Sequence, residues 1–442
     1  MSGRSRPPEW ERDDTRPQAV LVGVDRGAGE WPVEESLAEL EQLTYTAGAD
    51  VVATETQRLD KVNPRTFIGT GKAEDVAALA RSENAEIVVF DDELSPRQQA
   101  NLETLIPEVR ILDRTALILE IFAMHAVSRE GKLQVELAQL EYLLPRLRGM
   151  WGHLERERLG GGRGARFGAG ESQLETDRRL ARKRIADLRR ELKHVSAARE
   201  VQRKARSGSG VFRVALVGYT NAGKSSLLNA LTGAEVLAYD MLFATLDSTT
   251  RKLALADGRA ITITDTVGFI TKLPHGLVEA FKSTLDEVRE ADLLLHVVDA
   301  AHPQSAAQMA AVDIVLDEIG ATGSPRVLVL NKVDLLPADE RARMASRYPD
   351  AVLLSAANGE GTERLLERLA AEASRGSTTM TVLVPYTRGE LVQLAHERTH
   401  LVSERHTPEG TQLVMRVPSD IVPHFSEHEI EPISVVEADT PE

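Results

Sequence analysis

Short apolar runs alternate with amphipathic stretches along the first third of the chain. The apolar runs predict buried strands, and the stretches with apolar residues every three or four positions predict helices. The strands are expected at Ala19–Val24, Asp50–Thr54, Glu86–Phe90 and Val109–Leu112. The helices are expected at Val33–Ala47, Ala73–Ser82, Pro96–Leu105 and Thr115–Ala126. This alternation predicts a parallel-sheet α/β domain over residues 18–127, after a polar tail at 1–17 that we expect to be disordered.

Two apolar seams follow and predict an antiparallel helical hairpin over residues 128–206. The first seam consists of Leu133, Leu137, Leu140, Leu144, Leu147, Trp151 and Leu154. The second consists of Ala181, Ile185, Leu188, Leu192 and Val195. Pro145 should kink the first helix or end it. A glycine-rich loop at residues 159–170 would form the tip of the hairpin.

The stretch VALVGYTNAGKSSLLNAL at Val214–Leu231 combines a buried strand, a glycine-rich turn and a helix. It fits the pattern G-x-x-x-x-G-K-[ST] at Gly218, Gly223, Lys224 and Ser225. Backbone N–H groups of such a turn point at a phosphate, the lysine pairs with the β- and γ-phosphates, and the hydroxyl binds Mg²⁺. We therefore predict a doubly wound P-loop domain over residues 211–374, after a linker at 207–210, and the motifs that follow it indicate a GTPase domain.

Two further motifs supply candidate switch segments. In FATLD, Phe243–Asp247, Thr245 is the candidate that reaches Mg²⁺ and the γ-phosphate while triphosphate is bound. In DTVG, Asp265–Gly268, the carboxylate of Asp265 would hold Mg²⁺ through water and the Gly268 N–H would meet the γ-phosphate. The predicted catalytic residues are Lys224, Thr245 and Gly268, and the predicted Mg²⁺ site consists of Ser225, Thr245 and Asp265.

The last two nucleotide motifs predict the choice of base. In NKVD, Asn331–Asp334, the carboxylate of Asp334 can accept hydrogen bonds from a ring N–H and an exocyclic amine, which guanine has and adenine lacks. The segment Ser355, Ala356 and Ala357 would lie at the far edge of the base. The full set of predicted GTP contacts is Gly218, Tyr219, Thr220, Asn221, Ala222, Gly223, Lys224, Ser225, Phe243, Ala244, Thr245, Leu246, Asp247, Asp265, Thr266, Val267, Gly268, Asn331, Lys332, Val333, Asp334, Ser355, Ala356 and Ala357.

Phe269 stands where Ras-like proteins carry the glutamine that orients the attacking water. A phenyl ring cannot make that hydrogen bond, so we expect slow basal turnover unless a partner supplies the polar contact. Asn221 carries an amide beside the phosphates that can coordinate a monovalent cation. Potassium dependence is therefore a hypothesis, together with Mg²⁺ as the expected cofactor.

Charge is distributed unevenly along this acidic chain, whose net charge is −15. Between Leu144 and Arg206 there are 18 Lys and Arg against 8 Asp and Glu, so this stretch carries +10 and the remainder −25. Such a stretch is typical of an arm that binds a polyanion, although a solvated helix face gives the same composition. RNA contact is predicted at Gly160, Arg163, Arg166, Phe167, Arg178 and Arg179, where cations and an aromatic ring lie in or near a glycine-rich segment.

The rest of the composition excludes several classes of protein. There are no cysteines, which excludes disulfides, thiolate metal sites and cysteine nucleophiles. No apolar run approaches a membrane span, and the N-terminus has no apolar signal core. We expect a cytoplasmic monomer, with peripheral membrane association of part of it left open. A small C-terminal α+β domain is predicted over residues 375–425, before an acidic tail at 426–442.

With these residues in view, the chain resembles HflX-type GTPases, a ribosome-associated family of translation-factor-related GTPases. The most specific segments are FDDELSPRQQANLE at Phe90–Glu103, ILDRTALILEIFA at Ile111–Ala123, REGKLQVELAQLEYLLPRL at Arg129–Leu147, GGGRGARFGAGESQLETDRR at Gly160–Arg179, and DTVGFITKLPHGLVEAFKSTLDEV at Asp265–Val288. Phe269 agrees with the family pattern.

The resemblance implies binding to the large ribosomal subunit, with the loop at Gly160–Gly170 directed at the peptidyl-transferase centre. It further implies GTP-driven splitting of stalled or idle ribosomes under stress, and ATP binding by the N-terminal domain. The G-x-G at Gly69 and Gly71 is a weak signal that favours a tight turn over a second nucleotide site. Two alternatives stay open: an RNA-modification GTPase, against which the absence of cysteine counts, and an RNA chaperone or helicase acting off the ribosome.

Overall fold

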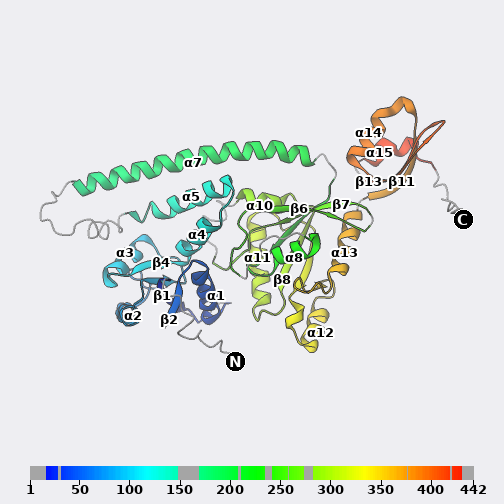
Figure 1. Cartoon of the computed structure of the whole chain (residues 1–442). Helices are drawn as coiled ribbons and strands as arrows, with labels where there is room; N and C mark the ends of the chain where they lie inside the picture. The colour runs from blue at the N-terminus through cyan, green and yellow to red at the C-terminus, as the bar shows by residue number, and fades with distance from the viewer. Residues whose placement is uncertain are drawn as a thin grey trace.

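The computed structural model describes residues 16–27, 31–147, 169–207, 211–233, 241–256, 258–272, 282–375, 377–418 and 421–430 (Figure 1). Most of the predicted N-terminal tail, nearly all of the hairpin tip, most of the linker at 207–210 and most of the acidic tail lie outside these residues. The predicted RNA contacts Gly160, Arg163, Arg166 and Phe167 lie outside them as well.

The N-terminal domain is the predicted parallel sheet with helices on both faces. Its strands are β1 (Gln18–Asp25), β2 (Asp50–Arg58), β3 (Ile87–Phe90) and β4 (Arg110–Asp113), in the order β2-β1-β3-β4. Its helices are α1 (Val33–Thr46), α2 (Thr70–Ser82), α3 (Pro96–Leu105) and α4 (Arg114–His125). Strand β1 is buried on both faces, as expected for a central parallel strand.

Local sequence explains where these helices begin. Ser95 caps α3 in a reciprocal capping box with Gln98, and the carboxylate of Asp113 accepts from the Ala116 N–H at 2.8 Å at the start of α4. Helix α2 begins three residues earlier than its apolar pattern predicts. Gly69 is its N-cap and Gly71 lies in its first turn, with the Gly69 N–H donating to Gln57 Oε1 at 2.9 Å.

The two helices α5 (Arg129–Leu143) and α7 (Ala169–Ser207) pack through the predicted seam (Figure 1). The buried residues of this contact are Leu133, Leu137, Ile185 and Leu188. Ion pairs flank it, with Arg184 Nε 2.6 Å from Glu136 Oε1 and Arg189 Nη2 2.7 Å from Glu141 Oε1. Helix α5 ends just before Pro145, as the proline predicts.

The GTPase domain is a six-stranded sheet in the order β10-β9-β8-β5-β7-β6, in which only β6 is antiparallel to its neighbour. The strands are β5 (Arg213–Gly218), β6 (Thr249–Ala254), β7 (Ala260–Asp265), β8 (Leu293–Asp299), β9 (Arg326–Asn331) and β10 (Val352–Leu353). The helices are α8 (Lys224–Thr232), α10 (Lys282–Arg289), α11 (Ser305–Glu318), α12 (Ala338–Arg347), α13 (Thr362–Ser374) and the 3-10 turn η2 (Val333–Leu335). The carboxyl ends of β5, β7 and β9 carry three of the predicted nucleotide motifs at one edge of the sheet.

The C-terminal domain lies beyond α13 and has its own core (Figure 1). Its antiparallel sheet, in the order β11-β13-β12, consists of β11 (Ser377–Val384), β12 (His400–Thr407) and β13 (Gly410–Pro418). Its helices are η3 (Tyr386–Arg388), α14 (Gly389–Arg398), α15 (Val422–Phe425) and η4 (Ser426–His428). The predicted fold class is confirmed in all its sheet-containing parts.

One hydrophobic core runs without interruption from the N-terminal domain into the GTPase domain. It includes Leu40 of α1 and Phe122 of α4 on one side, and Val217, Phe243 and Phe269 on the other. The ring of Phe122 meets that of Phe243 edge-on, with centroids 4.7 Å apart. The two domains therefore share buried apolar surface instead of meeting across a polar gap.

A buried guanidinium lies beside this shared core. Arg114, 1 % exposed, donates to Asp91 Oδ1 at 2.7 Å, to Glu39 Oε2 at 2.6 Å and to the Ser36 carbonyl at 3.0 Å. Burial raises the pKa of Asp91, but the cations Arg114 and Lys272 outweigh it and hold that pKa below its usual value. We call Arg114, Ser36, Glu39 and Asp91 the Arg114 cluster.

Replacing Arg114 with methionine should lower the free energy of unfolding by roughly 3–5 kcal/mol, because it removes the buried cation from Glu39 and leaves buried Asp91 with Lys272 alone. Urea unfolding followed by circular dichroism measures this change. Arg110→Met is the matched control, because it breaks the exposed Arg110–Glu120 pair four positions earlier in the chain. It should cost below about 1 kcal/mol. Equal losses for the two variants would contradict the structural role of the cluster.

A buried imidazole predicts how stability changes with pH. His296 lies in β8 between Val217 and Leu328, and burial lowers its pKa to about 4. The unfolded chain, with an imidazole pKa of about 6.5, binds more protons between these two values, so stability should fall as pH falls from about 6.5 toward 4. The slope of unfolding free energy against pH should become shallower in His296→Phe, by up to about 1.4 kcal/mol per pH unit. The same replacement at exposed His424 is the control, and an unchanged slope in His296→Phe would contradict this assignment.

Candidate nucleotide site

The glycine-rich turn between β5 and α8 has the backbone geometry that the motif predicts. Gly223 caps α8 in the left-handed conformation, with φ 91°. A Cβ atom there would lie 2.2 Å from Asn331 Nδ2, so no larger residue fits. The N–H groups in the first turn of α8 have no acceptor within the helix, so they are available to the anion that the glycine-rich turn would bind.

A pocket opens at this turn and brings three of the sequence motifs together. Its lining comes from the P-loop, from the FATLD segment and from the DTVG segment. The lining residues are Thr220, Asn221, Gly223, Lys224, Ser225, Ser226, Met241, Phe243, Ala244, Thr245, Thr266 and Gly268. Of these, Ser226 and Met241 were not predicted as contacts. Met241 lies outside any motif, so no sequence signal indicates it.

Lys224 is held inside the turn as a desolvated cation. Its Nζ donates to the carbonyls of Tyr219 and Gly218 at 2.8 and 3.2 Å. Burial lowers the pKa of Lys224 to about 8, partly offset by the nearby Asp265 carboxylate. Among the described residues, the Lys224 ammonium donates to carbonyls and has one nearby carboxylate, Asp265, so it is poised to bind an anion.

The three oxygens predicted to bind Mg²⁺ converge at the edge of the pocket. Ser225 Oγ lies 2.6 Å from Asp265 Oδ2 and 2.9 Å from Thr245 Oγ1. Asp265 Oδ1 is buried and has no hydrogen-bond partner among the described residues. Burial raises the pKa of Asp265, against the opposing effects of Lys224 and Ser225. Hydroxyl and carboxylate oxygens around an orphaned carboxylate oxygen suit a hard divalent cation.

The base-recognition motifs are joined by one asparagine. Asn331 Nδ2 donates to the Ala222 carbonyl at 2.8 Å, and its Oδ1 accepts from the Ala356 N–H at 3.0 Å. Asn331 therefore ties the P-loop to the segment Ser355–Ala357. Lys332 Nζ pairs with Asp299 Oδ2 at 2.8 Å, and the side chain of Asp334 is exposed on η2. The exposed carboxylate is free to meet a base that lies over this turn.

Several predicted contacts point their side chains away from the pocket. Leu246 is buried in the shared core, and the carboxylate of Asp247 bonds to the start of α5. The ring of Tyr219 is buried and its hydroxyl bonds to Glu39 of α1. Phe269 is 1 % exposed, so its ring fills the core and only its backbone bridges to the P-loop, with the Thr220 N–H donating to its carbonyl at 2.7 Å. These residues can meet a nucleotide through their backbone alone.

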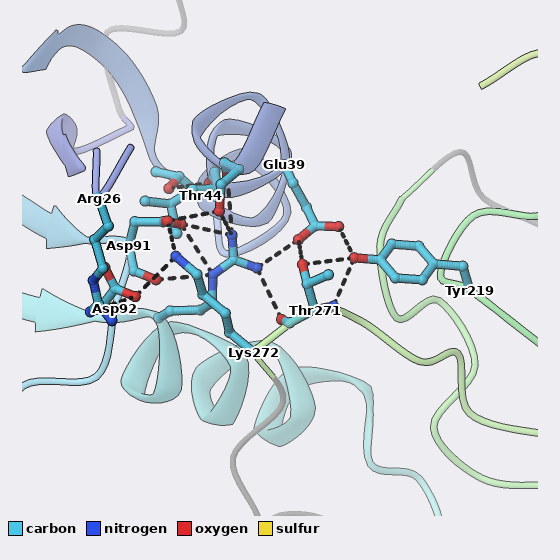
Figure 2. Close-up of polar contacts among 11 residues, drawn as sticks. Arg26, Glu39, Thr44, Asp91, Asp92, Tyr219, Thr271 and Lys272 are labelled. Atoms are coloured by element: carbon cyan, nitrogen blue, oxygen red, sulfur yellow. Dashed lines mark hydrogen bonds and ion pairs between the residues drawn. The ribbon is translucent and has the colours of Figure 1, made fainter. Parts of the chain in front are cut away.

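The N-terminal domain contributes residues that the motifs do not indicate. Glu39 accepts from Thr271 Oγ1 at 2.9 Å as well as from Tyr219, and Lys272 pairs with Asp91 and Asp92 (Figure 2). Thr271 and Lys272 lie just after the DTVG motif, separated from it by Phe269 and Ile270. The sequence signal for these contacts is indirect. Tyr219 in the P-loop and the polar residues Thr271 and Lys272 need polar partners once the fold covers them.

Of the predicted RNA contacts, the structure describes Arg178 and Arg179, which both lie on α7; Arg178 is half-buried and Arg179 is exposed. None of the described helices is long and apolar enough to cross a membrane.

Comparison with known proteins agrees with these motifs along most of the chain. Three family models match: "GTP-binding GTPase N-terminal" over residues 34–123, "GTP-binding GTPase Middle Region" over 125–206 and "50S ribosome-binding GTPase" over 213–332. GTPase HflX of Caldanaerobacter subterraneus is 45% identical over 413 residues, covering 93% of each chain. GTPase HflX of Escherichia coli is 44% identical over 416 residues, covering 92% of this chain and 95% of its own.

The chain belongs to the HflX family of GTPases. It is a GTP-hydrolysing enzyme, as its motifs predict. Among solved structures, a GTP-binding protein from Sulfolobus solfataricus in complex with GDP aligns at 25% identity and TM-score 0.43, over 81% of this HflX chain and 99% of its own.

Asp334→Asn should change which base this HflX protein prefers. An amide offers a donor where the carboxylate accepts from the guanine N–H groups, so GDP affinity should fall by about 10–150-fold. Xanthine, which has a carbonyl in place of the exocyclic amine, should gain relative affinity. Competition of GDP and XDP against a fluorescent nucleotide measures both. Glu340→Gln, on exposed α12, is a matched charge control, and an unchanged GDP-to-XDP ratio in Asp334→Asn would rule out base recognition by this carboxylate.

Proposed function

We propose that this HflX protein is a GTP-driven switch that binds the large ribosomal subunit and splits stalled or idle ribosomes, with hydrolysis permitting release. The observation that carries the switch is the pocket lined by Lys224, Ser225 and Thr245, beside which the buried Asp265 Oδ2 lies 2.6 Å from Ser225 Oγ. The FATLD segment lines this pocket through Phe243, Ala244 and Thr245, and the DTVG segment lines it through Thr266 and Gly268. A γ-phosphate there would hold both segments, and its loss would release them.

The proposed roles at the site follow from geometry. Lys224 would neutralise the β- and γ-phosphates, Gly268 would donate its N–H to the γ-phosphate, and Thr245 would close over it. Ser225, Thr245 and Asp265 would hold Mg²⁺, which would neutralise phosphate charge as the bond to the leaving group breaks. Asn221, in the left-handed conformation at φ 58° on the pocket wall, is the proposed ligand for K⁺.

Ribosome binding is supported by three observations of different kinds. The family model over the GTPase domain is described as a 50S ribosome-binding GTPase. Helix α7 is rich in Lys and Arg, and the stretch from Leu144 to Arg206 bears +10 on an otherwise acidic chain. The glycine-rich segment at the predicted hairpin tip adds Arg163, Arg166 and Phe167. A cytoplasmic location goes with this proposal, since ribosomes are the proposed partner.

Basal turnover should be slow, because Phe269 is buried in the core and offers no polar group to the attacking water. We therefore expect the ribosome to supply or position the missing contact. Turnover should rise by at least about tenfold with purified large subunits and much less with protein-free ribosomal RNA. The assay is GTP hydrolysis in potassium buffer, repeated in sodium buffer; equal rates in the two salts would remove the role proposed for K⁺.

Each outcome decides between functions. Equal stimulation by naked RNA would favour a chaperone or helicase that acts off the ribosome. Deleting Gly160–Gly170 should leave basal hydrolysis intact while stimulation by subunits falls, and loss of both would mean that the tip is structural. Splitting itself is measured by light scattering of intact ribosomes, and no dissociation with GTP would leave a ribosome-binding GTPase without splitting activity.

A further inference from the structure

The segment that carries Thr245 is anchored outside the GTPase domain, at the first turn of α5. The carboxylate of Asp247 accepts from the Val127 N–H at 2.9 Å, from the Ser128 N–H at 2.7 Å and from the Ser128 hydroxyl. Ser128 is itself the N-cap of α5, because its Oγ accepts from the Gly131 N–H at 2.9 Å. Asp247 therefore extends the cap of a helix 119 positions away in sequence.

The sterics of α5 match this contact. A Cβ atom on Gly131 would lie 2.6 Å from Asp247 Oδ1 and 3.1 Å from Ser128 Oγ. Glycine is normally unfavourable inside a helix by about 1 kcal/mol relative to alanine. Its presence in the first turn of α5 leaves the space that the carboxylate occupies.

Apolar contacts hold the same segment from the other side. Phe243 packs edge-on against Phe122 of α4, and Leu246 is 2 % exposed in the shared core. Phe243 adopts φ 58°, a conformation that is unfavourable for an aromatic residue and persists only where packing imposes it. The segment is thus held at three of its residues: Phe243 against α4, Leu246 in the shared core and Asp247 at the start of α5.

Between these anchors lies Thr245, whose Oγ1 is 2.9 Å from Ser225 Oγ in the pocket. Thr245 and Asp247 are two residues apart, and two residues of extended chain span at most about 7 Å. Thr245 therefore cannot retreat far from the pocket while Asp247 stays bonded to α5. In the structure both contacts are formed at the same time: Thr245 lies near the Mg²⁺ site and Asp247 is bonded at the start of α5.

We propose that Asp247 is a positioning residue that couples the nucleotide to the helical hairpin: bound triphosphate holds Thr245 inward and closes the Asp247–Ser128 cap, and hydrolysis opens it. This inference rests on the proposed role of Thr245. Coupling of two equilibria is reciprocal, so the closed cap must raise affinity for triphosphate relative to diphosphate by the same factor. The hairpin is the proposed ribosome-binding arm, and its first turn thereby reports the state of the nucleotide.

The test compares the affinities of a non-hydrolysable GTP analogue and GDP in the full chain. Asp247→Asn replaces one acceptor oxygen with a donor amide, and Ser128→Ala removes the hydroxyl; each should lower the analogue-to-GDP affinity ratio at least about fivefold. Ser128→Thr keeps a hydroxyl and should restore most of the ratio. Arg189→Ala, which breaks the Arg189–Glu141 pair elsewhere in the hairpin, should leave the ratio unchanged.

Gly131→Ala separates the contact from the stability of α5. Alanine favours the helix, yet its methyl group would displace the Asp247 carboxylate, so the ratio should fall although α5 itself becomes no weaker. Amide hydrogen exchange at Val127, Ser128 and Gly131 gives a second readout. Exchange there should be slower with the GTP analogue than with GDP in the natural sequence, and this difference should vanish in Asp247→Asn.

The outcomes distinguish this coupling from the role of Thr245. If Thr245→Ala lowers the affinity ratio while Asp247→Asn and Gly131→Ala do not, the coupling is wrong and the proposed nucleotide switch stands. If Thr245→Ala leaves the ratio unchanged as well, the switch assignment itself is wrong.

Discussion

The arrangement of the N-terminal domain against the GTPase domain depends on the buried guanidinium of Arg114. Arg114 is paired with Glu39 and Asp91. Each of these carboxylates also contacts the GTPase domain (Figure 2). Glu39 reaches Tyr219 of the P-loop and Thr271, while Asp91 reaches Lys272. Since a buried charge is tolerated only with its partners in place, this network fixes the N-terminal domain against the segment that follows Gly268. The shared apolar core then extends the same contact over α1 and α4.

The nucleotide motifs could be predicted from sequence because their geometry is local. A glycine-rich turn between a strand and a helix determines where Lys224 and Ser225 lie, and parallel strands bring Asp265 and Asn331 to the same edge of the sheet. The helices and strands of the N-terminal domain follow from apolar period and capping residues for the same reason. The predicted start of α2 is three residues late because Thr70, Gly71 and Lys72 carry no apolar signal, which shows the limit of periodicity at element ends.

The contacts between domains could not be predicted in this way. Arg114 and Glu39 are 75 positions apart, and Asp247 and Ser128 are 119 apart, so no local pattern relates them. The apolar residues Phe243, Leu246 and Phe269 fit a nucleotide loop equally well by position, and only the packing against α4 shows that their side chains belong to the core. For a polar residue beside a motif, the sequence gives the side chain, but its bonding partner becomes known only with the fold.

The two anchors of the GTPase domain differ in the cost of opening them. The Arg114 cluster is nearly inaccessible to water, so separating it would leave charges unpaired at several kcal/mol. Asp247 and Ser128 are partly exposed, so water can replace their hydrogen bonds at a net cost of about 1 kcal/mol each. A difference of this size assigns different mechanical roles to the two contacts. The Arg114 cluster is stable enough to act as a fixed point between the domains, whereas the Asp247 contact is weak enough for the loss of one phosphate to open it.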